Sequence, residues 1–291
     1  MLPLESVPNF SEGRDAATIE AIAAALSRRA RLLDVHSDPD HNRSVFTVVG
    51  EDDPLVNALE DAITVARDRI DLRSHEGAHP RIGAADVVPV VPLRPTDMER
   101  AKAAALRLAE RVGELGLPVF LYGELGSGRG PAFFRRGGLE ELASRLSDGL
   151  TPDFGPPELH PTAGCVLIGA RRPLIAFNVD LHGATLDDAR TIASAIRERD
   201  GGFPGVRALG LDLPSSGRVQ VSMNIEDWEA SALHEIVARI ETEAADLGVG
   251  VERAELVGLM PAGAAAAAAG SALRIDGLDG SRLIEPRLLE D

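Results

Sequence analysis

The chain has 291 residues with 46 acidic and 30 basic side chains, and its formal charge of −16 repels nucleic acid and anionic membrane surfaces, so neither is expected as a partner. Hydrophobic residues make up 44% of the chain but aromatic residues only 3%, so a core must be built mainly from Ala, Val, Leu and Ile. A single cysteine, no secretion signal and no run of about eighteen apolar residues indicate a cytoplasmic protein without an intrachain disulfide.

The first half of the chain alternates short apolar runs with longer stretches in which apolar residues recur three and four positions apart. The short runs predict strands and the longer stretches predict helices. In chain order the pattern predicts a helix at 15–29, strands at 31–37 and 43–50, a helix at 54–70, a strand at 85–93, a helix at 97–115 and a strand at 117–123.

A second series begins after a segment rich in Pro and Gly. It predicts strands at 165–170 and 173–181, a helix at 185–199, strands at 206–213 and 218–225, a helix at 227–248 and a short alanine-rich helix or tail segment at 261–270. We therefore predict an α/β (α+β) protein with two successive subdomains, residues 1–172 and 173–291, each a mixed β-sheet covered by helices.

The stretch "RSHEGAHPRIGAADVVPVVPL" at 73–93 places His75, His79, Arg81 and Asp86 on a glycine-broken loop before an apolar run. Pro80 fixes the backbone directly after His79 and favours an extended conformation for it. A histidine held in this way can act as a general acid or base near neutral pH. The alternative is a loop histidine that only bonds its own backbone.

The stretch "HSDPDHNRS" at 36–44 gathers four potential metal ligands, His36, Asp38, Asp40 and His41. Their spacing matches no established zinc or calcium pattern, and the same residue types are ordinary in turns. We expect no metal here, although a metal-dependent hydrolase stays as a weak alternative.

Two further features offer little chemistry. The glycines of "GELGSGRG" follow a predicted strand, but they match no nucleotide-binding pattern and Pro131 comes next instead of a clear helix start. We interpret this segment as a flexible surface loop. Cys165 stands among apolar residues and is predicted to be a small core residue and not a nucleophile.

The predicted junction between the halves carries His160, Arg171, Arg172 and Asn178. Arginines pair with carboxylates through two parallel hydrogen bonds, so this junction can hold an anionic ligand despite the acidic average. Arg171 and Arg172 fit a solvated hairpin tip equally well.

Taken in order, several stretches resemble the formiminotransferase domain family, whose members are folate-dependent enzymes of histidine degradation. They run from near the N-terminus to past residue 235: "VPNFSEGR", "LLDVHSDPDHNRSVFTVVGE", "HEGAHPRIGAADVVPVVPL", "LPVFLYGE", "PDFGP", "GARRPLIAFNVDL" and "VQVSMNIEDWEASALHEI". The resemblance implies transfer of a formimidoyl group from N-formimidoyl-L-glutamate to tetrahydrofolate, the co-substrate, giving 5-formimidoyltetrahydrofolate and glutamate. It also implies a ligand cleft between the two subdomains.

The resemblance assigns roles to particular residues. The family's catalytic histidine lies in an HPR motif, which here makes His79 the acid/base group. The family's folate-binding loop matches Gly155 through Gly164, which includes Pro156 and His160. His75 is then expected to support His79 or the loop.

Other roles are inferences from the chemistry of the residues. We infer that Arg43, Arg81 and Arg171 hold glutamyl carboxylates and that Asn178 contributes to the substrate site. Some family members carry an acidic residue where this chain has His36, so a proton-relay carboxylate is expected from Asp38 or Asp40 instead, and His36 itself is the third relay candidate.

Two alternatives stay open at this point. One is a related folate-dependent transferase that uses another formimidoyl or formyl donor, and the other is a folate-binding protein without catalysis. We expect a homodimer or a higher homo-oligomer that acts on small molecules. Because the sequence ends where the vertebrate bifunctional enzyme continues into a cyclodeaminase domain, a separate protein is expected to release ammonia from the product.

Overall fold

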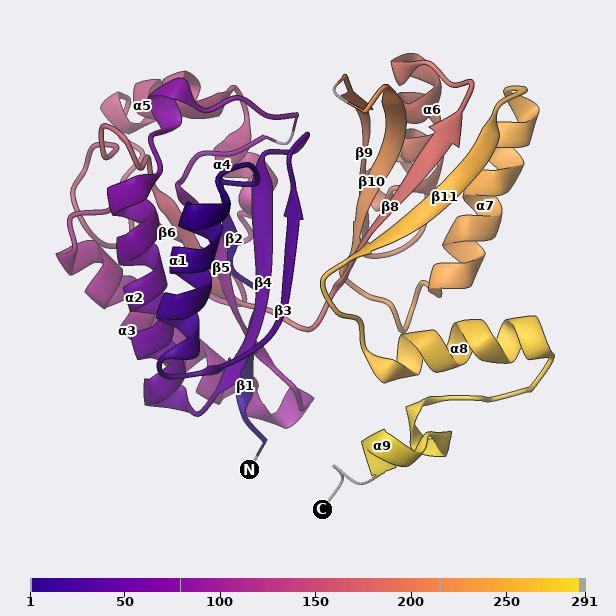
Figure 1. Ribbon diagram of the computed structural model, residues 1–291, viewed down its shortest axis with the longest axis horizontal. Coiled ribbons are helices and arrows are strands. Elements are labelled where there is room, and N and C mark those ends of the chain that lie inside the picture. The colour runs from indigo at the N-terminus through magenta and orange to yellow at the C-terminus, as the bar shows by residue number, and fades with distance from the viewer. Residues whose placement is uncertain (1, 79, 215, 288–291) are drawn as a thin grey trace. The chain divides into compact units, whose positions relative to one another are not determined.

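The computed structural model describes residues 2–78, 80–214 and 216–287. The chain divides into two compact units, the first ending at Arg172 and the second beginning at Pro173. Each unit contains one β-sheet with helices packed on it (Figure 1). The predicted α/β class with two successive subdomains is confirmed.

The first unit carries strands β1 to β7 and helices α1 to α5. The strands are β1 (Leu4–Ser6), β2 (Asn9–Phe10), β3 (Arg31–Asp38), β4 (Arg43–Gly50), β5 (Ala85–Pro92), β6 (Val119–Gly123) and β7 (Val166–Ala170). The helices are α1 (Ala16–Ser27), α2 (Asp52–Arg69), α3 (Met98–Glu114), α4 (Pro131–Arg135) and α5 (Gly138–Ser147), with 3-10 turns at Leu72–Ser74 and Pro95–Asp97.

The sheet of the first unit is mixed, as predicted. The two short strands β1 and β2 both pair with β4 on one side and with β5 on the other, so together they fill one position between these strands. These pairs are antiparallel, as is the β3–β4 hairpin, whereas β7 pairs in parallel with β5 and β6. Since both faces of β5 are covered, its residues Ala85–Pro92 are all buried.

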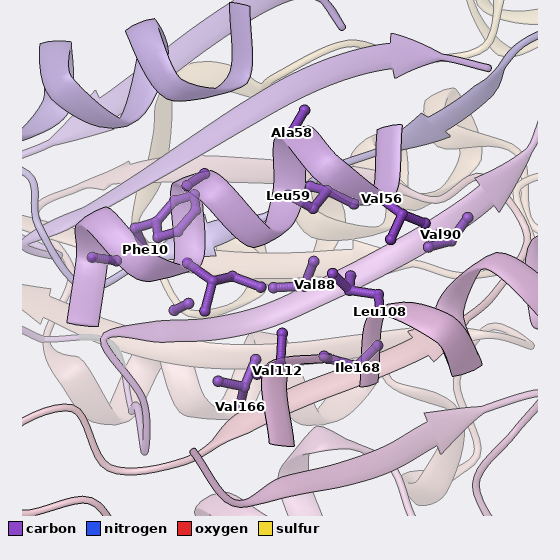
Figure 2. Packing of buried hydrophobic residues seen from close by; sticks show 14 of the residues in the cluster. Phe10, Val56, Ala58, Leu59, Val88, Val90, Leu108, Val112, Val166 and Ile168 are labelled. Atoms are coloured by element: carbon purple, nitrogen blue, oxygen red, sulfur yellow. The ribbon is translucent and has the colours of Figure 1, made fainter. Parts of the chain in front are cut away.

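Helices α1, α2 and α3 cover one face of this sheet and enclose its main core (Figure 1). Aliphatic side chains of α2 and α3 meet those of β5 and β7 there, with Phe10 at one end (Figure 2). A smaller cluster on the other side joins Phe120 of β6 and Phe134 of α4, whose ring centroids are 4.8 Å apart. Cys165 belongs to this cluster and is fully buried, which confirms its predicted place in the core.

The second unit carries strands β8 to β11 and helices α6 to α9. The strands are β8 (Ile175–His182), β9 (Val206–Leu213), β10 (Arg218–Ile225) and β11 (Gly250–Val257). The helices are α6 (Leu186–Ile196), α7 (Leu233–Asp246), α8 (Ala262–Leu273) and α9 (Ile284–Arg287), with 3-10 turns at Glu198–Asp200 and Gly280–Arg282. Helix α6 begins with a capping box, in which Thr185 and Asp188 bond each other's backbone N–H groups.

The sheet of the second unit differs from the mixed sheet that we predicted. Its order is β11-β8-β10-β9, and every pairing in it is antiparallel. The reason is that β10 lies between β8 and β9, so the two strands joined by α6 do not pair with each other. β11, which the sequence pattern does not predict, returns along β8 as the last strand of a β-α-β-β-α-β series. Helices α6 and α7 share one core with this sheet.

One open alternative and two local predictions are wrong. Arg171 and Arg172 form no hairpin tip, because they connect β7 of the first sheet to β8 of the second. A helix, α4, does begin at Pro131, where the missing N–H costs nothing in the first turn. Helix α7 begins at Leu233 and not at 227. Within the residues that the structure describes, no helix combines the length and apolar character needed to cross a membrane.

Candidate functional site

A small pocket opens in the first unit where β2, β4 and β5 lie side by side. Register places Phe10 of β2 opposite Ser44 of β4 and Ala85 of β5. We call this the Arg43 pocket, and its lining residues are Phe10, Ser11, His41, Arg43, Arg81 and Asp86. Its cavity volume of about 10 Å³ has room for about one water-sized group. The pocket itself therefore suits one small polar group and not a whole substrate.

Arg43 begins β4 and gives the pocket its charge. Its Nε atom is buried and has no hydrogen-bond acceptor among the described residues. Burial lowers the pKa of Arg43 to about 9, the positive charge of Arg135 adds to this effect and the negative charge of Asp86 opposes it. The guanidinium is still charged at neutral pH, so an anion placed beside it would be stabilised.

Asp86 is the carboxylate that faces these arginines. Its side chain is 4% exposed, and its Oδ1 accepts a hydrogen bond of 2.9 Å from the N–H of Ile82. Its other oxygen forms a short ion pair with Arg135 of α4, whose side chain is 15% exposed. Burial also lowers the pKa of Arg81, and Asp86 opposes that shift too. One carboxylate therefore faces three arginines.

The β3–β4 hairpin contributes His41 to the pocket. We call residues 38–42 the 38–42 turn. Oδ1 of Asp38 accepts hydrogen bonds of 2.8 Å from the N–H groups of Asp40 and His41, and it lies 3.1 Å from Nδ1 of the His41 ring. Burial alone would raise the pKa of Asp38, but the hydrogen bonds and charge of His41 outweigh it and hold the pKa at about 2. Asp38 is therefore ionised at neutral pH.

The loop that leads to His79 is hydrogen-bonded to the 38–42 turn. The N–H of Ala78 donates to the carbonyl of Asp40 at 3.1 Å, and Nδ2 of Asn42 donates to the carbonyl of Glu76 at 2.9 Å. A Cβ atom on Gly77 would lie 2.4 Å from the carbonyl oxygen of His41, so only glycine allows this approach. His79 itself lies outside the described residues, whereas Ala78 and Arg81 on either side are described.

His75 connects this loop to the pocket. Its Nε2 lies 3.1 Å from the carbonyl oxygen of Asn42, and its Nδ1 contacts Nη1 of Arg81. Nη2 of Arg81 donates to the carbonyl of Gly77 at 2.8 Å. A neutral His75 that donates from Nε2 and accepts at Nδ1 satisfies both contacts. His75 thus positions Arg81.

The segment from Gly155 to Gly164 packs against the chain that follows Arg81. Gly83 and Gly164 pair, and a Cβ atom on Gly164 would lie 2.1 Å from the carbonyl oxygen of Ile82. Gly155 has a φ of +82° and sits so close to Leu117 that a Cβ atom would lie 2.2 Å from its carbonyl oxygen. Both glycines are therefore required by the backbone itself.

His160 stabilises the tight turn within this segment. Its Nδ1 accepts a hydrogen bond of 3.1 Å from the N–H of Ala163, and its backbone pairs with that of Gly164. Burial, and then the charge of Arg67, lower the pKa of His160, so the ring is neutral at neutral pH. Pro156 is half-buried in the same segment.

Three predicted site residues lie elsewhere. Arg171 directly follows Ala170, the last residue of β7, which pairs with Val90 of β5. This places Arg171 about 15 Å from Asp86, measured along the strands. It lies near Glu5. Asn178 belongs to the second unit, where its amide donates to Glu255 at 3.1 Å. His36 lies on β3 opposite Val45 and is not among the residues that line the Arg43 pocket.

Sequence reasoning named His41 only as a possible metal ligand, gave no role to Asp86 and missed Arg135 altogether. Asp86 and Arg135 are 49 positions apart, and no local pattern marks such a pair. The signal for His41 was present in "DPDHNRS", but its relation to Asp38 became visible only with the hairpin. Among the described residues no three His, Cys, Asp or Glu side chains gather in a way that could hold a metal ion.

The chain is similar in sequence to proteins of a known family. Residues 3–171 match the N-terminal subdomain of the formiminotransferase domain, and residues 176–277 match the formiminotransferase domain that follows it. The chain belongs to the formiminotransferase domain family.

Its relatives include two proteins of similar length. The glutamate formimidoyltransferase of Streptococcus pyogenes serotype M1 is 37% identical, covering 98% of each chain, and that of Thermoplasma acidophilum is 39% identical, covering 98% of this chain and 97% of the relative. The formimidoyltransferase-cyclodeaminase of Rattus norvegicus is 40% identical over 89% of this chain and 50% of its own.

Proposed function

We propose that this protein transfers the formimidoyl group of N-formimidoyl-L-glutamate to tetrahydrofolate, giving 5-formimidoyltetrahydrofolate and L-glutamate. Both matched segments belong to the formiminotransferase domain, and two relatives named glutamate formimidoyltransferase are similar over nearly the whole chain. Tetrahydrofolate is the co-substrate, and the protein is a transferase of small molecules.

The buried positive charge of the Arg43 pocket is the observation that supports a binding site for the donor there. Three arginines share one carboxylate there, and Nε of Arg43 has no acceptor among the described residues. The donor carries two carboxylates, and an arginine pairs with a carboxylate through charge-assisted hydrogen bonds. We place one glutamyl carboxylate at Arg43 and Arg81.

The acid/base group of this proposal is His79. It lies outside the described residues, but its neighbour Ala78 bonds the 38–42 turn and Arg81 lines the Arg43 pocket. The proposal draws its support from these neighbours and from the HPR motif. A histidine here would take the proton from the attacking nitrogen N5 of tetrahydrofolate.

The folate partners of the proposal come from Gly155 to Gly164. Gly155 is exposed, Pro156 is half-buried, and His160 keeps its Nδ1 in the turn, so only its other nitrogen would contact folate. Arg171 and Asn178 stay predictions, and so do His36, Asp38 and Asp40 as a relay to His79. Because Arg171 lies far along the strands from Asp86, it does not share the carboxylate that we assign to Arg43.

The test is a transfer assay with both substrates, following 5-formimidoyltetrahydrofolate for the wild type, Arg43→Gln and His79→Ala. Loss of a charge-assisted pair worth about 1.5–3 kcal/mol should raise the KM for the donor about 10- to 100-fold in Arg43→Gln. His79→Ala should lower kcat about 100-fold or more. Arg190→Gln is the matched control, since Arg190 is exposed on α6 and its ion pair within the described part of the chain is with the exposed Asp187.

Other outcomes decide against parts of the proposal. A wild type that binds tetrahydrofolate by calorimetry but transfers nothing from this donor would point to another formimidoyl or formyl donor, or to a binding role if every donor fails. An unchanged KM in Arg43→Gln would remove the carboxylate from the Arg43 pocket while leaving the reaction in place.

Three expectations accompany the proposal. A homodimer or higher homo-oligomer is tested by light scattering on the purified protein. Activity without metal is tested by assay after chelation together with elemental analysis. Cytoplasmic location is tested by cell fractionation.

A further inference from the structure

The proposed transfer moves two protons, and this inference rests on that proposed function. N5 of tetrahydrofolate attacks the formimidoyl carbon and loses its proton, and a tetrahedral carbon forms. The bond from that carbon to the glutamate nitrogen then breaks, and the departing nitrogen must gain a proton because an amide ion is a very poor leaving group. One group takes the first proton and one group supplies the second.

A second imidazole stands in the pocket with a partner that orients it. The His41 side chain is 8% exposed and lines the Arg43 pocket, and its Nδ1 lies 3.1 Å from Oδ1 of Asp38. A proton on Nδ1 fixes the tautomer in which Nε2 exchanges protons. We propose that His41, oriented by Asp38, is a second proton-transfer group, which protonates the glutamate nitrogen as it leaves.

The backbone of the turn is closed by hydrogen bonds other than those of the His41 ring. Asp38 already closes the turn by accepting the N–H groups of Asp40 and His41, and Asn42 bonds Gly13 and Glu76. The contact between His41 and Asp38 instead orients the imidazole. Its place next to Arg43, which we assign to the donor carboxylate, puts it within the donor's half of the reaction.

The partner carboxylate suits a proton donor. Asp38 stays ionised at neutral pH, because its pKa is held at about 2. An ionised carboxylate at Nδ1 orients the ring and makes Nε2 the nitrogen that gives the proton. Each turnover leaves His41 neutral and the base that served N5 protonated, and exchange with solvent restores both.

Two variants separate this role from a structural one. His41→Gln should lower kcat about 100-fold at saturating donor, within the usual contribution of a general acid. Asp38→Asn keeps an oxygen that accepts both backbone N–H groups and removes only the charge, so it should lower kcat about 10-fold with little change in either KM. His182→Gln is the matched control, since His182 is exposed at the end of β8.

The decisive measurement changes the leaving group. N-formimidoyl-4-aminobenzoate keeps a carboxylate, but its nitrogen is a weakly basic aniline that departs with much less need of a proton. With this donor the loss in kcat of His41→Gln should shrink from about 100-fold to less than about 10-fold. The loss in His79→Ala, which we place on the folate nitrogen, should be the same with both donors.

The outcomes distinguish the inference from the function on which it rests. An unchanged kcat in His41→Gln, or an equal loss with both donors, overturns the role of His41 and leaves the transfer reaction standing. A wild type without transfer overturns both. If His41→Gln fails to fold by circular dichroism, Asp38→Asn with the two donors decides, because its turn is preserved.

Discussion

Two buried carboxylates, one in each unit, are surrounded by arginines in opposite ways. Asp180 of β8 accepts hydrogen bonds from Gln220 at 2.8 Å, from Arg218 at 3.1 Å and from Arg253 at 2.8 Å. Asp86 of β5 accepts from one backbone N–H and pairs with Arg135. The two arginines of Asp180 are 36% and 51% exposed, so their charges reach water.

The contrast separates an ion cluster that is complete from one that is not. Around Asp180 the arginine and glutamine donors bond the carboxylate or reach water. Such a cluster stabilises the sheet without needing a ligand. Around Asp86 the positive charge is buried and exceeds the negative charge, and Nε of Arg43 has no acceptor among the described residues. An incomplete cluster of this kind is what an anionic substrate would complete.

The largest expected effect is that of Asp86→Asn. The amide keeps an oxygen for the N–H of Ile82 but leaves Arg135 and Arg43 without a counter-charge, and breaking a buried pair in this way costs about 3–5 kcal/mol of unfolding free energy. Urea unfolding followed by circular dichroism measures the loss. A loss below about 1 kcal/mol would mean that water already screens these arginines.

The single tryptophan allows the unfolding of the second unit to be followed separately. Trp228 packs against the core of the second unit, so its fluorescence follows the unfolding of that unit. Circular dichroism reports both units, so Asp86→Asn should shift the circular dichroism transition and leave the fluorescence transition in place, whereas Asp180→Asn should shift the fluorescence transition. Formate or glutamate added to the wild type should stabilise the first unit, because an anion at Arg43 supplies the missing charge.

A smaller effect is expected from acid at the 38–42 turn. The pKa of Asp38 is lowered from 3.8 to about 2, so its ionised form stabilises the fold above pH 4, and this contribution is lost as the pH falls through 2. The shift corresponds to about 2 kcal/mol. The difference in unfolding free energy between the wild type and Asp38→Asn should therefore shrink between pH 4 and pH 2. A difference that stays constant with pH would show that the charge of Asp38 contributes nothing.

The sequence predicted the elements whose faces are apolar and missed those whose role is set by distant residues. Most helices and strands of the first unit carry clear periodicity, and they were placed correctly. β11 was missed because its middle residues are exposed and charged, so no apolar alternation marks it. Helix α4 was missed because Pro131 was interpreted as a breaker, although it occupies the first turn.

For the candidate site, the sequence indicated segments but not how they come together. "HEGAHPR" and "HSDPDHNRS" mark two segments that the structure brings into contact, and they stand out because they concentrate histidine and aspartate in loops. Their assembly was not predictable, since Asn42 contacts Glu76 across 34 positions and Asp86 pairs with Arg135 across 49. The 73 positions between Asp180 and Arg253 make the same point for a cluster with no assigned function.

The smallest expected effect completes the contrast. Asp180→Asn keeps an oxygen for the amide of Gln220 and removes the charge that faces Arg218 and Arg253. Both guanidinium groups can turn to water, so the expected loss is about 1 kcal/mol, several times less than for Asp86→Asn. The loss should fall further in 1 M salt, which screens exposed charges and affects buried pairs much less. An equal loss for the two variants, unchanged by salt, would mean that both carboxylates serve only stability and that an unbalanced arginine cluster does not mark the donor site.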